Sequence, residues 1–175
     1  IDNYDELVKA QSAYGREIYD DRSRCSPSLL RISDKILAGF LYSKILAAPQ
    51  YVDVDLQVLS REIVTSVSEH FLVEIIGVLV DNAFEAATPA RNQVEMVLDA
   101  RDDKLIYMIK NQVEHLTMGE IQHFFEKGYS TKQNREGRGL GLYQANRIAI
   151  SHNGEITVEL LERAGVQEIC FRVEI

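Results

Sequence analysis

The first residues that could bind a ligand or a metal lie in the run Val80–Ala86, where polar side chains interrupt an otherwise apolar helix. Apolar residues at helical spacing predict a helix over 66–87. Its core face would be formed by Leu72, Ile75, Ile76, Leu79, Ala83 and Ala86. Asn82 falls on another face, and its carbonyl oxygen suits Mg²⁺, a hard cation that takes one or two protein oxygens besides phosphates and water. Taken alone, the pattern fits a surface-facing Asn82 better than a metal ligand.

A glycine-rich loop is the second chemical group. Gly137, Gly139 and Gly141 alternate directly before a predicted helix over 140–151. Glycines let the backbone approach a phosphate, and a helix N-terminus presents free N–H groups to it. Hydroxyls and cations surround the loop: Ser130, Thr131, Lys132, Arg135 and Arg138. The spacing is neither a Walker P-loop nor a dinucleotide fingerprint. By itself the loop is equally consistent with a flexible connection.

The elements that position these groups follow from hydrophobic periodicity. Helices are predicted over 3–21, 28–48, 66–87, 117–127 and 140–151, and strands over 52–58, 93–100, 104–111, 155–161 and 166–175. Ser26-Pro27 is a start signal for the second helix, and Ser66 with Glu69 forms a capping box for the third. Since most strands are joined by hairpins, we expect an α+β fold, a mixed, mostly antiparallel sheet with helices on one face.

Composition excludes several classes of protein. The chain is 46% hydrophobic and 26% charged, as in ordinary globular domains. Its net charge of −8 argues against nucleic-acid binding, which draws affinity from basic side chains. No apolar run approaches the roughly 20 residues of a membrane span. Because the sequence starts at Ile1 without a signal peptide, we expect a fragment whose parent carries any membrane segment elsewhere.

Together the two groups resemble the GHKL superfamily of ATP-binding domains, with gyrase-type, heat-shock-chaperone, histidine-kinase and mismatch-repair members. The helix segment around Asn82 looks like the N box, and the loop from Gly137 looks like the last glycine box. The run from Phe125 to Tyr143 is most similar to the citrate-sensor and peptide-quorum-sensing (Agr-type) histidine kinases. The resemblance covers about residues 50–175. It implies a Bergerat-type (GHKL) sandwich that binds ATP and Mg²⁺.

Roles carry over by position from that resemblance. It makes Asn82, as the Mg²⁺ ligand, and Lys132, in the ATP lid, the catalytic residues. The other ATP-binding residues that it implies are Asp81, Glu85, Asn111, Gly128, Ser130, Thr131, Gly137, Arg138, Gly139, Leu140 and Gly141. It also implies that residues 1–48 form a helical segment, the tail of a dimerisation and phosphoacceptor hairpin with its linker, and that residues 49–175 form the ATP-binding catalytic domain.

Three positions depart from the family pattern. Asn111 stands where an Asp usually holds the adenine amino group, which predicts ATP binding weaker by about one order of magnitude and looser purine selectivity. Glu85 stands where many histidine kinases have a basic residue, so either a water-mediated metal contact or a solvent-facing carboxylate is expected. Val78 replaces the Glu that activates water in ATP-hydrolysing members, and an aliphatic side chain takes no proton. Negligible hydrolysis, and phosphoryl transfer to a protein group, are therefore predicted.

The phosphoacceptor in kinases of this type is usually a His followed by an acidic residue. None of His70, His115, His123 and His152 is followed by Asp or Glu. We therefore expect the acceptor on a helix before Ile1. The resemblance implies a catalytic domain of a two-component sensor histidine kinase that transfers the γ-phosphate of ATP to that His. It implies a response regulator as partner, a homodimer through helices at or before the N-terminus, and a cytoplasmic position in a membrane-bound bacterial receptor.

Two alternatives remain open at the level of sequence. An anti-sigma-type serine kinase shares the fold without the His hairpin, but the predicted helical stretch over 3–48 argues against it. A degenerate module that only dimerises or docks a response regulator would account for the missing Asp box. Mg-dependent ATP binding, compared between the wild type and Asn82→Ala, separates this module from both kinases.

Overall fold

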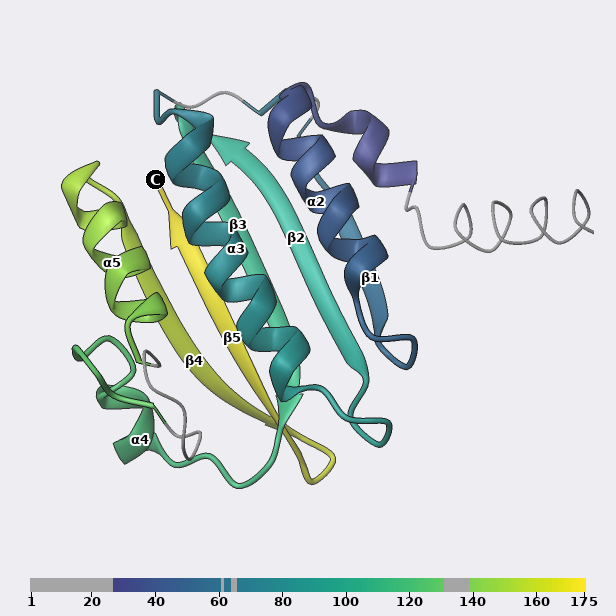
Figure 1. Ribbon diagram of the computed structural model, residues 1–175, viewed down its shortest axis with the longest axis vertical. Helices are drawn as coiled ribbons and strands as arrows, with labels where there is room; N and C mark the ends of the chain where they lie inside the picture. The colour runs from purple at the N-terminus through teal and green to yellow at the C-terminus, as the bar shows by residue number, and fades with distance from the viewer. Residues whose placement is uncertain (1–26, 61, 64–65, 131–138) are drawn as a thin grey trace, which may run out of the picture.

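The computed structural model describes residues 27–60, 62–63, 66–130 and 139–175. One five-stranded sheet is covered on one face by helices (Figure 1). The strands are β1 (Asp53–Val58), β2 (Gln93–Arg101), β3 (Lys104–Val113), β4 (Glu155–Arg163) and β5 (Val166–Glu174); the helices are the 3-10 helix η1 (Pro27–Arg31), α2 (Lys35–Ala47), α3 (Glu69–Ala86), α4 (Met118–Gln122) and α5 (Gly141–Ser151). The helix predicted over 3–21 lies outside the described residues.

The sheet order is β1-β2-β3-β5-β4, with β1 parallel to β2 and the remaining pairs antiparallel. This confirms the predicted mixed, mostly antiparallel sheet. Tight turns set the register of both hairpins. Asp102 and Asp103 have φ of 51° and 61°, and Ala164 and Gly165 have φ of 51° and 78°. Two consecutive left-handed residues match the twist of the flanking strands.

The hydrophobic core lies between the sheet and α3. On α3, Leu72, Ile75 and Ile76 are at most 1% exposed, as the helical pattern predicts. The strands contribute alternate residues to the same core, among them Met96, Leu98, Leu105, Tyr107 and Ile109. Because this face of α3 is fixed against the sheet, the directions of the remaining side chains of α3 are fixed too. The core therefore determines where Asn82 points.

The helix predicted over 28–48 is wrong as a single element. The chain forms η1 first, and α2 begins only at Lys35. The Asp34 carboxylate accepts hydrogen bonds from the backbone N–H groups of Ile36 (2.9 Å) and Leu37 (3.0 Å). Asp is a strong N-cap because it satisfies N–H groups that have no partner inside the helix. This cap divides the segment, and the Ser26 part of the predicted start signal lies outside the described residues.

The predicted starts of two other helices also change. The capping box of Ser66 and Glu69 is wrong, because α3 begins at Glu69 and its N-cap residue is Ser68, which makes no side-chain cap hydrogen bond. A full capping box occurs instead at α4, where Thr117 and Glu120 each bond the backbone of the other. Helix α4 spans Met118–Gln122 and is shorter than the predicted 117–127.

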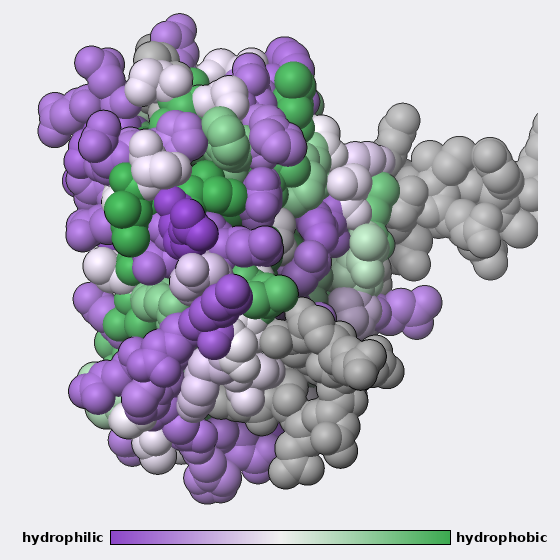
Figure 2. Space-filling view, turned by 60° about the vertical axis from the view of Figure 1, so that its left-hand side comes forward, coloured by the Kyte–Doolittle hydropathy of each residue, from purple (hydrophilic) through white to green (hydrophobic). Residues whose placement is uncertain are grey.

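The surface of the sheet and helices is largely polar. Asp53 and Asp55 are both exposed on β1 and face water. On the side of the molecule shown in Figure 2, hydrophilic residues cover most of the surface and hydrophobic residues form smaller patches between them. Among the described residues, no helix is both long and apolar enough to cross a bilayer.

A buried carboxylate joins the ends of β1 and β2. Asp99 is 6% exposed, accepts a hydrogen bond from the Ser60 hydroxyl, and pairs with Arg101 Nε at 2.8 Å. The hydrogen bond from Ser60 is the largest cause that lowers the pKa of Asp99 below its ordinary value. A lowered folded-state pKa stabilises the protein above the unfolded-state pKa, and this contribution is lost as the pH falls through the folded-state value.

Removing that hydroxyl gives a pH-dependent loss of stability. We expect Ser60→Ala to lower the free energy of unfolding by about 1.5–3 kcal/mol at pH 7, the usual worth of a hydrogen bond to a charged group. The difference from wild type should begin to shrink below the ordinary Asp pKa of about 3.9 and disappear as the pH falls through the lower folded-state pKa of Asp99, because only then is Asp99 protonated in both states. Urea unfolding across this pH range measures it. Ser43→Ala, which removes an exposed hydroxyl bonded only to a backbone carbonyl, is the control. A pH-independent loss would contradict the expectation.

Candidate functional site

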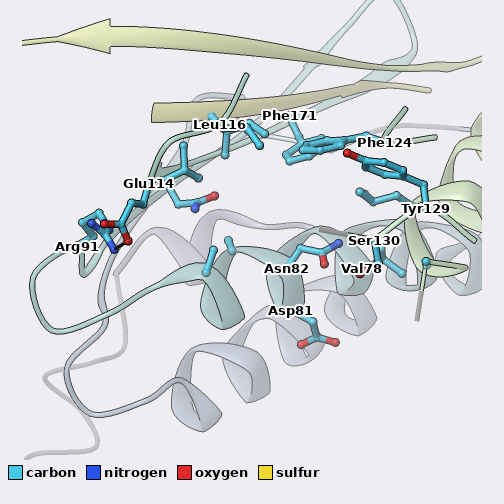
Figure 3. A pocket seen from close by; sticks show the side chains of 18 of the residues that line it. Val78, Asp81, Asn82, Arg91, Glu114, Leu116, Phe124, Tyr129, Ser130 and Phe171 are labelled. Atoms are coloured by element: carbon cyan, nitrogen blue, oxygen red, sulfur yellow. Dashed lines mark hydrogen bonds and ion pairs between the residues drawn. The ribbon is translucent and has the colours of Figure 1, made fainter. Parts of the chain in front are cut away.

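A cavity of about 550 Å³ opens beside α3 (Figure 3). Its volume is in the range of small-molecule and cofactor sites. It lies between the C-terminal half of α3, the end of β3, the segment around α4 and the start of α5. The lining residues used below are Val78, Asn82, Thr88, Arg91, Asn111, Glu114, Phe124, Tyr129, Ser130, Gly139, Gly141 and Phe171.

Asn82 faces this cavity. The helix α3 presents Val78 and Asn82, one turn apart, to the cavity side, where Gly139 and Gly141 also lie. Val78 and Gly141 are close neighbours, because a methyl group built on Gly141 would come 3.2 Å from Val78. The amide predicted to hold Mg²⁺ therefore shares one cavity with Gly139 and Gly141, two of the glycines predicted to hold phosphates, although Gly139 lies 57 positions after Asn82 in the sequence.

The side chains of Asp81 and Glu85 have other surroundings than the side chain of Asn82. Asp81 points away from Asn82 (Figure 3), and its carboxylate pairs with Lys44 of α2 at 2.6 Å. Helix α2 also packs Phe40 against α3 near Gly77, where a built methyl group would come 3.2 Å from the ring. Glu85 is exposed and is not among the residues that line the cavity. Asp81 still lines the cavity together with Asn82, although its carboxylate is paired with Lys44, and the ATP contacts expected of Asp81 and Glu85 remain predictions.

The backbones of Gly128 and Gly139 are in contact, and this contact is called the glycine turn below. The N–H of Gly128 donates to the carbonyl of Gly139 at 3.0 Å, so the two ends of the segment between them meet. Gly139 has φ of 87°, and a methyl group built there would lie 2.5 Å from the carbonyl carbon of Gly128. Only glycine permits this contact. Thr131, Lys132, Gly137 and Arg138, which were predicted to bind ATP, lie outside the described residues.

Helix α5 begins at Gly141, directly after this turn. Its N-cap residue is Leu140, whose aliphatic side chain cannot accept a hydrogen bond from the first N–H groups of the helix. Those groups and the positive end of the helix dipole lie beside the cavity, because Gly141 lines it. A helix start of this kind binds phosphate oxygens.

Asn111 lies near the C-terminal end of β3, where the family's Asp would be. It is 5% exposed and pairs with Val94 of β2 and Ile169 of β5. Its amide nitrogen Nδ2 donates to the backbone carbonyl of Gln112 at 3.1 Å. This bond orients the amide, so the oxygen Oδ1 is the atom available to accept a hydrogen bond from a ligand.

Sequence reasoning did not find an aromatic wall of the cavity. Phe124 and Phe171 stack with centroids 6.2 Å apart and planes at 16°, and Tyr129 lies 6.2 Å from Phe124. Phe171 reads as an ordinary core residue in the alternation of β5. The aromatic residues Phe124, Phe125 and Tyr129 lie close together in the sequence before the glycine-rich loop, but this pattern alone does not predict a binding role. These rings give the cavity an apolar wall on the side of Ser130 (Figure 3), against which the ribose of a nucleotide can pack.

A polar corner of the cavity was also missed. Arg91 and Glu114 form an ion pair at 2.6 Å. The hydroxyl of Thr88 and the Nε of Arg91 are buried and have no hydrogen-bond partner among the described residues. A buried polar group left in this state costs about 1–3 kcal/mol, so such groups are rare in folded proteins unless water or a ligand completes the bond.

Metal binding at this cavity would rest on few protein atoms. Within the described ranges, no group of three or more His, Cys, Asp or Glu side chains could hold a metal ion. The Asn82 amide oxygen facing the cavity is a single hard donor. Mg²⁺ is commonly bound in this way, by one or two protein oxygens while substrate phosphates and water complete the shell. The side chains present therefore fit a metal that arrives with a triphosphate.

Comparison with known proteins places the chain in a family. Residues 67–175 match the family described as histidine kinase-, DNA gyrase B-, and HSP90-like ATPase. The chain therefore belongs to this ATPase family, as a GHKL-type catalytic domain of the sensor histidine kinase class. The family is one of ATP-binding domains, so ATP is the nucleotide that a domain of this family binds.

The relatives agree with that class. The sensor histidine kinase DcuS of Escherichia coli is 30% identical over 160 residues, which cover 89% of this chain and 28% of DcuS. The sensor protein CitS of Halalkalibacterium halodurans is 27% identical over 148 residues, 81% of this chain and 27% of CitS. These relatives confirm the resemblance to sensor histidine kinases. The chain spans about a quarter of the length of the curated relatives it matches.

Solved structures show the same fold. The mycobacterial sensor histidine kinase MprB matches with a TM-score of 0.62 at 17% identity, over 80% of this chain and 93% of that chain. The nucleotide-free catalytic domain of histidine kinase ThkA matches with a TM-score of 0.61 at 18% identity, over 79% and 87% respectively. The predicted α+β fold of the GHKL type is confirmed.

Proposed function

We propose that this chain binds Mg-ATP and transfers its γ-phosphate to a His on a helix upstream of Ile1, as the catalytic part of a two-component sensor histidine kinase. One observation carries the proposal. The Asn82 amide, Gly139, whose carbonyl accepts a hydrogen bond from the Gly128 N–H, and the start of α5 at Gly141 face the same cavity. This arrangement offers a hard oxygen for a metal beside N–H groups suited to phosphate.

Each part of the cavity has a task in this proposal. Asn82 holds Mg²⁺, which supplies charge neutralisation for the phosphates when it is bound. The N–H groups at Gly141 and the Ser130 region bind the triphosphate, and Asn111 accepts a hydrogen bond from the base. Phosphoryl transfer depends mainly on positioning and electrostatics, so a cavity that orients the triphosphate is sufficient without a covalent role for the protein. Lys132, in the lid, is proposed as the cation that assists.

Val78 supports transfer to a protein in preference to water. It lies on the cavity side of α3, one turn before Asn82, and packs toward Gly141. An aliphatic group there excludes water and cannot act as a general base. A His acceptor upstream of Ile1 implies a homodimer or a hairpin that presents it, a response regulator that receives the phosphoryl group, and a cytoplasmic location for this domain. A degenerate docking module is not favoured, because the family is one of ATP-binding domains and the similar proteins are sensor histidine kinases.

Phosphotransfer between separate chains tests this function. We expect this chain with γ-labelled ATP to label a separate upstream fragment that carries the phosphoacceptor helix, and to label itself not at all. The matched control replaces the acceptor His of that fragment with Gln. Free phosphate should stay close to the background of a protein-free reaction, since Val78 provides no base. Label on this chain alone, or rapid release of phosphate, would contradict the proposal.

A further inference from the structure

One end of the cavity carries polar groups that the proposed function leaves without a role. Ser130 lies at one end of the cavity, and Gly139 is close to it because Gly139 contacts Tyr129; Arg91 and Glu114 lie at the opposite end, beyond Asn82 (Figure 3). A nucleotide whose triphosphate lies at the glycine turn extends its base toward the second end. The side chains of that end therefore meet the base.

Thr88 and Arg91 belong to one tight turn that follows α3. The N–H of Thr88 donates to the carbonyl of Arg91 at 3.0 Å, and the N–H of Arg91 donates to the carbonyl of Thr88 at 2.9 Å. Pro89 lies inside the turn and restricts its backbone. Both side chains line the cavity. Their backbone positions are thus fixed, and only side-chain rotation is needed to present them to a ligand.

Two polar atoms of this turn lack hydrogen-bond partners among the described residues, and both belong to side chains that line the cavity. They are Thr88 Oγ1 and Arg91 Nε, and both are buried. Another nitrogen of the same guanidinium, Arg91 Nη2, donates a hydrogen bond to the Glu114 carboxylate at 2.6 Å, and this bond fixes the position of the group. A buried N–H with no partner in the free protein indicates a group completed by water or a ligand.

Donors and acceptors at this end have a defined order. Asn111 Nδ2 is engaged with the Gln112 carbonyl, so Asn111 presents its oxygen as an acceptor. Arg91 Nε can only donate. An acceptor and a donor on the wall of one cavity can complement the edge of a 6-aminopurine, whose amino group donates and whose adjacent ring nitrogen accepts. A 6-oxopurine presents the reverse pattern, an oxygen that accepts and a ring N–H that donates.

We propose that Thr88 and Arg91 are specificity-determining residues that bind the base edge and, with the oriented Asn111 amide, select 6-aminopurine over 6-oxopurine nucleotides. Glu114 is a positioning residue that acts through Arg91. The proposal rests on the proposed function and opposes the looser purine selectivity that the neutral Asn111 alone predicts. A neutral amide discriminates poorly when it is free to turn over, and the bond to Gln112 prevents this.

Binding measured with and without a base tests the proposal. The variants are Thr88→Val, which keeps the side-chain shape, and Arg91→Lys, which keeps the charge but loses the Nε donor. Matched controls are Thr157→Val and Arg163→Lys, both at exposed positions of β4. Calorimetric titrations with magnesium use ATP, GTP and inorganic tripolyphosphate, which has no base. Thermal unfolding confirms that each variant is folded.

We expect wild type to bind ATP at least about tenfold more tightly than GTP, and each variant to lose about three- to tenfold in ATP affinity with tripolyphosphate unchanged. The ATP-to-GTP ratio should fall accordingly. An unchanged ratio, or an equal loss for ATP and tripolyphosphate, overturns the role of Thr88 and Arg91 while the proposed function stands. A wild type that binds neither ATP nor tripolyphosphate overturns the proposed function itself.

Discussion

Asn82→Ala is expected to lower the affinity for Mg-ATP by about ten- to a hundredfold, the worth of one interaction with a charged group. The reason is that Asn82 supplies the protein oxygen proposed to bind the metal, and no cluster of acidic ligands stands beside it in the described chain. The loss should depend on magnesium. With a chelator present, wild type should fall to the level of the variant. Calorimetric titration of ATP with and without Mg²⁺ measures both effects.

Stability distinguishes a lost ligand from a damaged fold. Asn82 is only half-buried on α3, and Ala has the higher helix propensity, so the free energy of unfolding should stay equal or rise by a few tenths of a kcal/mol. Asn92→Ala is the matched control, since it removes a half-buried amide that does not line the cavity. Equal ATP affinities for Asn82→Ala and wild type would contradict the role of Asn82 as the metal ligand, and the kinase proposal depends on that role.

The fold could be predicted from the sequence because its strongest signals are local. The alternation along β2–β3 and β4–β5 and the turn residues Asp102 and Asp103 specify hairpins by themselves. Helix starts were less predictable. The Asp34 cap and the late start of α3 depend on which of several polar residues meets the first N–H groups, and tertiary packing decides this.

The candidate site could be predicted only where residue type and spacing reveal chemistry. Asn82 and the glycines stood out because an amide in an apolar helix and alternating glycines are unusual in their surroundings. Arg91, Glu114 and Phe171 did not, because an Arg after a turn, a Glu after a strand and a Phe in a strand are ordinary. Only the pairing of β3 with β5 and the return of the chain after α3 bring them to one cavity.

The two sides of α3 connect the cavity to the preceding helix. Phe40 and Lys44 of α2 contact the side that carries Gly77 and Asp81, and Asn82 occupies the other side. Exposed ion pairs contribute at most about 1 kcal/mol, so the Lys44–Asp81 pair is a minor source of stability. Its position explains why Asp81 and Asn82, adjacent in the sequence, serve different contacts: a helix turns consecutive side chains by about 100°.

Gly139→Ala is expected to reduce the rate of phosphotransfer by on the order of a hundredfold, the effect of moving reactive groups by about 1 Å. A methyl group at this position would lie 2.5 Å from the Gly128 carbonyl carbon and 2.6 Å from the Tyr129 carbonyl oxygen, so the backbone has to move apart. The movement breaks the Gly128–Gly139 hydrogen bond and shifts Tyr129 and Ser130, which line the cavity. The labelled transfer assay measures the rate.

Backbone strain alone does not account for such a loss, and Gly165→Ala shows the difference. Gly165 has φ of 78°, close to the 87° of Gly139, but a methyl group built there meets nothing within 4 Å. Both variants should lose about 1–2 kcal/mol of stability from the left-handed conformation. Only Gly139→Ala should lose phosphotransfer, because only there does the methyl group occupy the place of another backbone segment. Equal transfer rates for the two variants would show that the closed turn is dispensable for holding the triphosphate.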